Sequence, residues 1–140
     1  MPPELPPESG FEEIEHTADY ALRVTGKDLP ALLHNAARGM THLLAGNADI
    51  PLTHTETLEM DAFDAETLLV NWLSELAYRA EVDSLLFPDI TLTDVSPTHL
   101  RAILRGGPAS LQKHIKAVTY HNLQIVRTAH GLEATIVFDV

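Results

Sequence analysis

Cysteine is absent from the 140 residues of this sequence. Disulfide bonds, thiolate metal sites and cysteine nucleophiles are therefore excluded together. Any metal ion that the chain binds must be held by oxygen or imidazole ligands. A metal site in this protein would thus be built from carboxylates, carbonyl groups or histidines.

Basic residues are also scarce. The chain has 9 lysine and arginine residues against 20 aspartate and glutamate residues, which gives a formal net charge of −11. This is the wrong sign for a surface that neutralises phosphates and releases their counterions. We therefore expect no direct binding to RNA or DNA. The charge favours a basic protein partner, a cation or simply high solubility.

Long apolar runs are missing as well. No stretch approaches the roughly 18 consecutive apolar residues of a membrane span, and the N-terminus lacks the basic and then apolar order of a signal peptide. We expect a soluble, cytoplasmic protein that does not contact a membrane. A length of 140 residues with 45% hydrophobic content suits one domain with one core.

Residues 1–10 differ in composition from the rest of the chain. They contain four prolines and two glutamates, and Leu5 is their only bulky apolar residue beyond Met1. Such a segment cannot bury enough surface to order itself. We expect a flexible, proline-rich tail over residues 1–10 and a folded domain over residues 11–140, without internal repeats.

The first half of the domain carries a strand pattern and then a helix pattern. Tyr20, Leu22 and Val24 alternate with smaller or polar residues, and Gly26 ends the run, which predicts a half-buried strand. Asp28 stands as an N-cap ahead of a helix that ends near Gly46. The helical stripe that should face the core consists of Leu29, Leu32, Leu33, Ala36, Ala37, Met40, Leu43 and Leu44.

The second half repeats this order and then becomes rich in strands. Residues 53–62 alternate and predict a strand, and Asp64 is the N-cap of a second amphipathic helix with Trp72 in its core stripe. Beyond Pro88, short alternating runs follow at 90–95, 100–104, 114–120, 123–127 and 132–138. The predicted fold class is α+β, a single domain with two amphipathic helices packed on a largely antiparallel sheet.

Three places could carry chemistry, and the first is the segment from His16 to Asp19. Polar groups at the edge of a strand can face a cleft while the strand holds them in place. The alternative interpretation is a local turn made by Thr17 and Asp19, with His16 merely exposed to solvent.

The second place is the segment from Lys116 to Asn122. On an extended strand Lys116 and His121 lie on opposite faces, because side chains alternate. A break near Asn122 could bring them together, although the spacing does not require one. The simpler interpretation makes Tyr120 a packed aromatic and Lys116 a solvated surface lysine.

The third place is the end of the chain. An apolar strand that stops after Asp139 puts its carboxylate next to the α-carboxylate of Val140. Like charges held together raise one pKa or recruit a cation. With Asp19 from another strand, the group would offer three hard oxygen donors, which suits Ca²⁺, Mg²⁺ or Mn²⁺. The alternative is a frayed terminal strand whose carboxylates bind only water.

Four segments of the sequence, taken in order and spacing, resemble the archease family. They are His16 to Asp19 with the following strand and Gly26 to Leu29, residues 68–76, residues 116–121 and the terminal residues 137–140. The resemblance covers nearly the whole predicted domain.

The resemblance implies a protein that is not itself an enzyme. It implies an activator that promotes the guanylylation and multiple turnover of an RtcB-type RNA ligase in tRNA splicing or RNA repair. It also implies a divalent metal site at Asp19, Asp139 and Val140, with calcium as the expected ion and magnesium or manganese as alternatives. His16, Lys116 and His121 would be neighbours of that site.

Two other functions remain open from the residues alone. A free-standing metal-dependent phosphoester hydrolase could use Asp19, Asp139 and His121 to activate water, but the sequence has no nucleophile motif and no phosphate-binding glycine loop. A general chaperone or scaffold is the other alternative.

Overall fold

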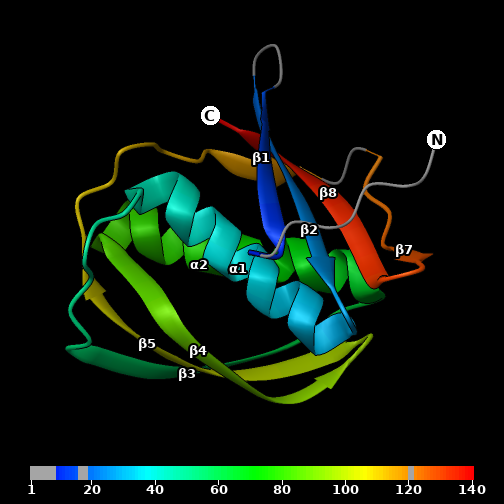
Figure 1. The fold of residues 1–140 in the computed structure, drawn as a ribbon. Coiled ribbons are helices and arrows are strands. Elements are labelled where there is room, and N and C mark those ends of the chain that lie inside the picture. Colours follow the sequence, from blue (N-terminus) through cyan, green and yellow to red (C-terminus); the bar gives the residue numbers. More distant parts are fainter. Residues whose placement is uncertain (1–8, 16–18, 120–121) are drawn as a thin grey trace.

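Two antiparallel sheets enclose two helices in this protein (Figure 1). The computed structural model describes residues 9–15, 19–119 and 122–140, with only the backbone described for Glu15 and Asp19. The predicted fold class is confirmed, since two amphipathic helices pack on antiparallel strands. The strands divide into two sheets, whereas periodicity alone predicted one.

The first sheet brings distant parts of the chain together. Its order is β1–β2–β8–β6, and β7 pairs with another part of β8; every pairing is antiparallel. The strands are β1 (Phe11–Glu15), β2 (Asp19–Gly26), β6 (Ala117–Thr119), β7 (Val126–Thr128) and β8 (Gly131–Asp139). β8 therefore lies between a strand from the start of the domain and strands from its end.

The second sheet has the order β3–β5–β4. Its strands are β3 (His54–Asp61), β4 (Leu85–Ser96) and β5 (His99–Pro108). The prediction placed the start of β4 after Pro88, and this boundary was wrong: the strand begins at Leu85 and contains the proline. The pairing shifts register between Leu86 and Asp89, so the ladder is interrupted where proline has no N–H to donate.

Both helices begin where their capping residues predicted. α1 (Leu29–Ala45) is capped by Asp28, whose carboxylate accepts a hydrogen bond from the Ala31 N–H at 3.0 Å. α2 (Ala65–Asp83) is capped by Asp64, which accepts from the Thr67 N–H at 2.8 Å. These caps satisfy N–H groups that have no partner within a helix, and so they fix both N-termini.

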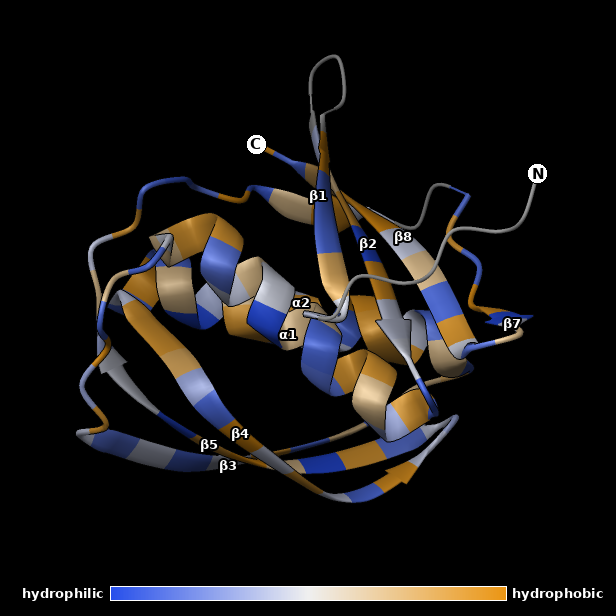
Figure 2. Cartoon of the chain, in the orientation of Figure 1, coloured by the Kyte–Doolittle hydropathy of each residue, from blue (hydrophilic) through white to orange (hydrophobic). Residues whose placement is uncertain are grey.

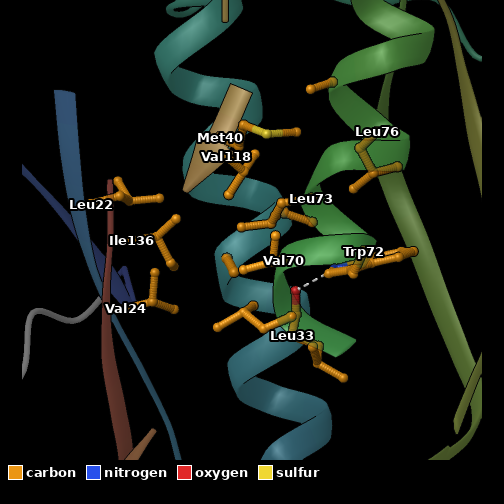
Figure 3. Packing of buried hydrophobic residues seen from close by; sticks show 14 of the residues in the cluster. Leu22, Val24, Leu33, Met40, Val70, Trp72, Leu73, Leu76, Val118 and Ile136 are labelled. Carbon is orange, nitrogen blue, oxygen red and sulfur yellow. Dashed lines mark hydrogen bonds between the residues drawn. The ribbon is translucent and has the colours of Figure 1, made fainter. Parts of the chain in front are cut away.

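The core lies between the helices and the sheets. Figure 3 shows Leu22, Val24 and Ile136 pointing from β2 and β8 toward the helices. Trp72 of α2 is fully buried, and its indole N–H donates to the Leu33 carbonyl of α1 at 2.9 Å. In Figure 2, apolar and polar residues alternate along much of β4, as expected for a strand with one buried face.

Shorter elements departed from the predicted runs. Among the described residues of the run at 114–120, only 117–119 form a strand, and the run at 123–127 is displaced to 126–128. Residues 1–8 of the predicted tail lie outside the described residues, whereas the Gly10 carbonyl accepts from the Thr25 N–H at 2.9 Å. Among the described residues, no helix has the length and apolar character needed to cross a membrane.

Candidate functional site

Asp19 and Asp139 are direct register partners in the pairing of β2 with β8. They lie 120 positions apart in the sequence. Tyr20 and Phe138 form the next pair of the ladder, and Phe138 is fully buried. The antiparallel sheet thus brings together two residues that the sequence predicted as parts of one site.

Asp139 is also fixed from its other side. Its register partner there is Ala117 of β6, and its carbonyl accepts a hydrogen bond from the Lys116 N–H at 2.7 Å. The half-buried Val140 packs against the hydrophobic core. Asp139 is therefore held between two strands, whereas a frayed terminal strand would lack these contacts.

The remaining predicted neighbours are described only in part. Lys116 is exposed, in agreement with its interpretation as a surface lysine. His16 and His121 lie outside the described residues, as does the side chain of Asp19. Among the side chains that the structure does describe, no group of three or more His, Asp or Glu residues is arranged to hold a metal ion.

A strap, defined here as residues 109–116, connects β5 to β6 and leads to this end of the sheet. Glu81 of α2 holds it: the carboxylate accepts from the Ile115 N–H at 3.1 Å and lies 3.0 Å from His114 Nδ1. Just before these residues, the Lys113 ammonium lies 3.6 Å from the centroid of the Tyr20 ring. The strap therefore contacts both α2 and the residue after Asp19.

A groove of about 350 Å³ runs between α2 and the end of the strap. The residues that line it include Ala77, Tyr78, Glu81, Ile115, Lys116 and Val118. Lys116 also donates its N–H to the Asp139 carbonyl, so one lining residue of the groove is hydrogen-bonded to the end of β8. This groove could not be predicted from the sequence, since Glu81 has the pattern of a solvent-facing helix residue and its partners follow 33 and 34 positions later.

A separate cluster of charges lies at the β4–β5 turn. His99 Nδ1 is 2.8 Å from an Asp61 carboxylate oxygen, and Nε2 lies 3.6 Å from Glu59 and 3.5 Å from Asp94. The hydrogen bond with Asp61 raises the pKa of His99 above 6.5, although burial opposes this and the other carboxylates add to it. The cluster joins the ends of three strands of the second sheet, whereas Asp139 ends β8 in the first sheet (Figure 1).

Another set of ion pairs stabilises the contact between β3 and α2. Arg79 of α2 binds Glu56 of β3 and, one turn away, Glu75 at 2.7 Å. Burial tends to raise the pKa of Glu56, but hydrogen bonds from His54 and Arg79 outweigh it and hold this pKa below 4.5. These groups satisfy one another, which indicates a structural role.

Comparison with known proteins gives consistent results across the domain. A family model described as the Archease protein family matches residues 11–140. The chain is 33% identical over 138 residues to the protein archease of Methanopyrus kandleri, covering 93% of this chain and 99% of that relative. It is 32% identical over 139 residues to the protein archease of Methanosarcina barkeri, covering 93% and 95%.

Solved structures share the fold. The solution structure of protein 1598 from Methanobacterium thermoautotrophicum has a TM-score of 0.74 at 23% identity, covering 94% of this chain and 99% of that one. The crystal structure of an archease, described as a possible chaperone, from Thermotoga maritima has a TM-score of 0.63 at 25% identity, covering 92% and 96%.

Proposed function

The chain belongs to the archease family, and from this premise we propose that it activates an RtcB-type RNA ligase as an accessory protein. In this proposal it promotes guanylylation and multiple turnover of the ligase in tRNA splicing or RNA repair, and it does so with a divalent metal ion. The observation that carries the site is the register pairing of Asp19 with Asp139.

The donor set fits a hard divalent ion. Residues directly opposite in an antiparallel pair have Cβ atoms roughly 5 Å apart, a spacing at which two carboxylates can share one cation. Asp139 is exposed, so an ion bound there is accessible to a partner. We propose Asp19, Asp139 and Val140 as the ligands, with oxygen donors throughout, and Ca²⁺ as the ion, with Mg²⁺ or Mn²⁺ as alternatives.

The role of the chain's own residues is to hold and present the cation. A divalent ion supplies charge neutralisation at phosphoryl groups, which is what the guanylylation step requires. The backbone hydrogen bond from Lys116 to Asp139 fixes the main chain beside the proposed ligand. In this proposal the chain itself makes and breaks no covalent bond. Its net charge of −11 favours binding to a basic protein surface over binding to bare RNA.

A multiple-turnover ligation assay tests the proposal. The ligase from the same organism would be incubated with GTP, a divalent ion and RNA ends bearing a 2′,3′-cyclic phosphate and a 5′-hydroxyl. Wild-type protein should raise the number of turnovers, and Asp139→Asn should abolish this stimulation. Asp49→Asn is the matched control, because it removes one exposed carboxylate from a loop elsewhere in the chain.

The assay also separates the alternatives. No stimulation by the wild-type protein, or full stimulation by both Asp19→Asn and Asp139→Asn, contradicts the proposed role. Phosphoester cleavage by the purified protein alone with Mn²⁺ would favour a hydrolase. If the protein protected unrelated proteins against aggregation as well as it protected the ligase, a general chaperone would be favoured. This is the role suggested in the description of the Thermotoga maritima structure.

A further inference from the structure

We propose that the groove between α2 and the strap is the docking site for a basic segment of the ligase that carries an apolar anchor residue. This inference rests on the proposed function, because it names the surface through which the same partner would approach Asp139. It is carried by the apolar surface of the groove, by the charges around it and by the hydrogen bond that links its lining residue Lys116 to the end of β8.

The floor of the groove is apolar and its opening exposes further apolar surface. Ala77, Ile115 and Val118 line it and are themselves buried. At the opening, Tyr78 is 61% exposed, and Val82, one helical turn later, is 60% exposed. Positions i and i+4 lie on the same face of a helix, so these two side chains form one apolar surface beside the groove. Such a surface next to a concavity is typical of an interaction site.

The strap, whose last residues form one side of the groove, is held by hydrogen bonds to the rest of the fold. The Ala109 N–H donates to the Ser84 carbonyl at 2.9 Å, and the Gln112 N–H donates to the Leu44 carbonyl at 2.6 Å. The carboxylate of Glu81 fixes the strap at Ile115. Figure 1 shows the strap passing the C-terminal end of α2 before it reaches β6. A preformed groove lowers the ordering cost of binding.

The charges around the opening favour a basic occupant. Glu81 lines the groove, and Glu75 and Asp83 lie on the same half of α2 as Tyr78; the cations beside them are Arg79 and, in the lining, Lys116. Arg79 is already bound by Glu56 and Glu75. The acidic tail of this chain, with Glu4 and Glu8 among its prolines, is a poor match for such a rim. An arginine- or lysine-bearing segment of the ligase with one aromatic or long aliphatic side chain fits both features.

The location of the groove explains how docking would serve the proposed activity. Lys116 lines the groove, and its backbone N–H donates to the Asp139 carbonyl. A ligase segment in the groove would therefore contact a residue that is hydrogen-bonded to Asp139. Docking and cation presentation would be adjacent and separable steps.

Titration of the protein into the ligase tests the inference. The double variant Tyr78→Ala with Val82→Ala should raise Kd at least about tenfold. Phe63→Ala is the matched control, since Phe63 is 89% exposed but lies at the start of α2, far from the groove, and its Kd should stay within about twofold of the wild-type value. Circular dichroism spectra should match that of the wild-type protein for both variants, which would show that both are folded.

Ligation assays distinguish failure of docking from failure of the proposed function. The groove variant should need at least about ten times more protein for half-maximal stimulation, with an unchanged plateau. Asp139→Asn should bind the ligase but abolish the plateau. Wild-type affinity of the groove variant overturns the docking site and leaves the proposed function standing. A wild-type protein that neither binds nor stimulates the ligase overturns both.

Discussion

Asp19 and Asp139 are direct partners across the pairing of β2 with β8, which makes metal binding testable on this chain without the ligase. We expect titration calorimetry to detect Ca²⁺ or Mn²⁺ binding to the wild-type protein. Asp19→Asn and Asp139→Asn should each weaken it by more than about tenfold, because even residues that only orient metal ligands typically contribute that much.

Charge alone could also attract cations to so acidic a protein, and the controls address this. Asp49→Asn changes the net charge by the same amount and should leave the affinity unchanged. Adding residues after Val140 should weaken binding if its α-carboxylate is the third donor. Equal affinity in the wild-type and both aspartate variants would argue against a cation site at this pair.

His99 should make the stability of the β4–β5 turn depend on pH. The hydrogen bond with Asp61 raises the pKa of His99 above its ordinary 6.5. The stabilisation is therefore fully present below pH 6.5 and is lost as the pH rises through the raised pKa. Chemical denaturation across this window should show the wild-type protein losing stability relative to His99→Gln.

The exposed His130 provides the control for that experiment. His130→Gln should follow the wild-type pH profile. If His99→Gln and the wild-type protein keep a constant difference in stability across the whole range, the carboxylates around His99 do not favour its protonated form.

Trp72 should contribute measurably to the stability of the core. Trp72→Phe removes the hydrogen bond to the Leu33 carbonyl and leaves unfilled volume between the helices. We expect a loss of about 1–3 kcal/mol in the free energy of unfolding. Urea unfolding should be followed by circular dichroism, since this substitution removes the only tryptophan. Phe63→Leu, at a highly exposed position, should change little.

The helices could be predicted from the sequence because their signals are local. Asp28 and Asp64 each precede an apolar stripe, and the structure places both residues at an N-cap. The division into two sheets could not be predicted, because it depends on which strands pair over long distances. β6 was overestimated because the apolar residue Ile115 belongs to the strap, where Glu81 binds its N–H.

The candidate site, like the fold, could be predicted only in part. Each segment could be singled out by its carboxylates or its position at the end of a strand, and Asp19 could be proposed as a partner of Asp139. Only the family resemblance gave a reason to prefer this arrangement to a frayed terminus. The groove gave no signal in the sequence, since Tyr78 and Val82 look like ordinary surface positions on a helix. Its other wall is supplied by a segment that has little regular structure.

The pairing of β2 with β8 also has a consequence for biosynthesis. A ribosome would release β2 about a hundred residues before the strand that completes its sheet, and contacts between such distant segments form slowly. Until β8 is made, the edge of β2 that it pairs with has no hydrogen-bonded partner. The nascent chain would therefore be vulnerable to aggregation and proteolysis until β8 emerges, and it would acquire the proposed ligand Asp139 only at that moment.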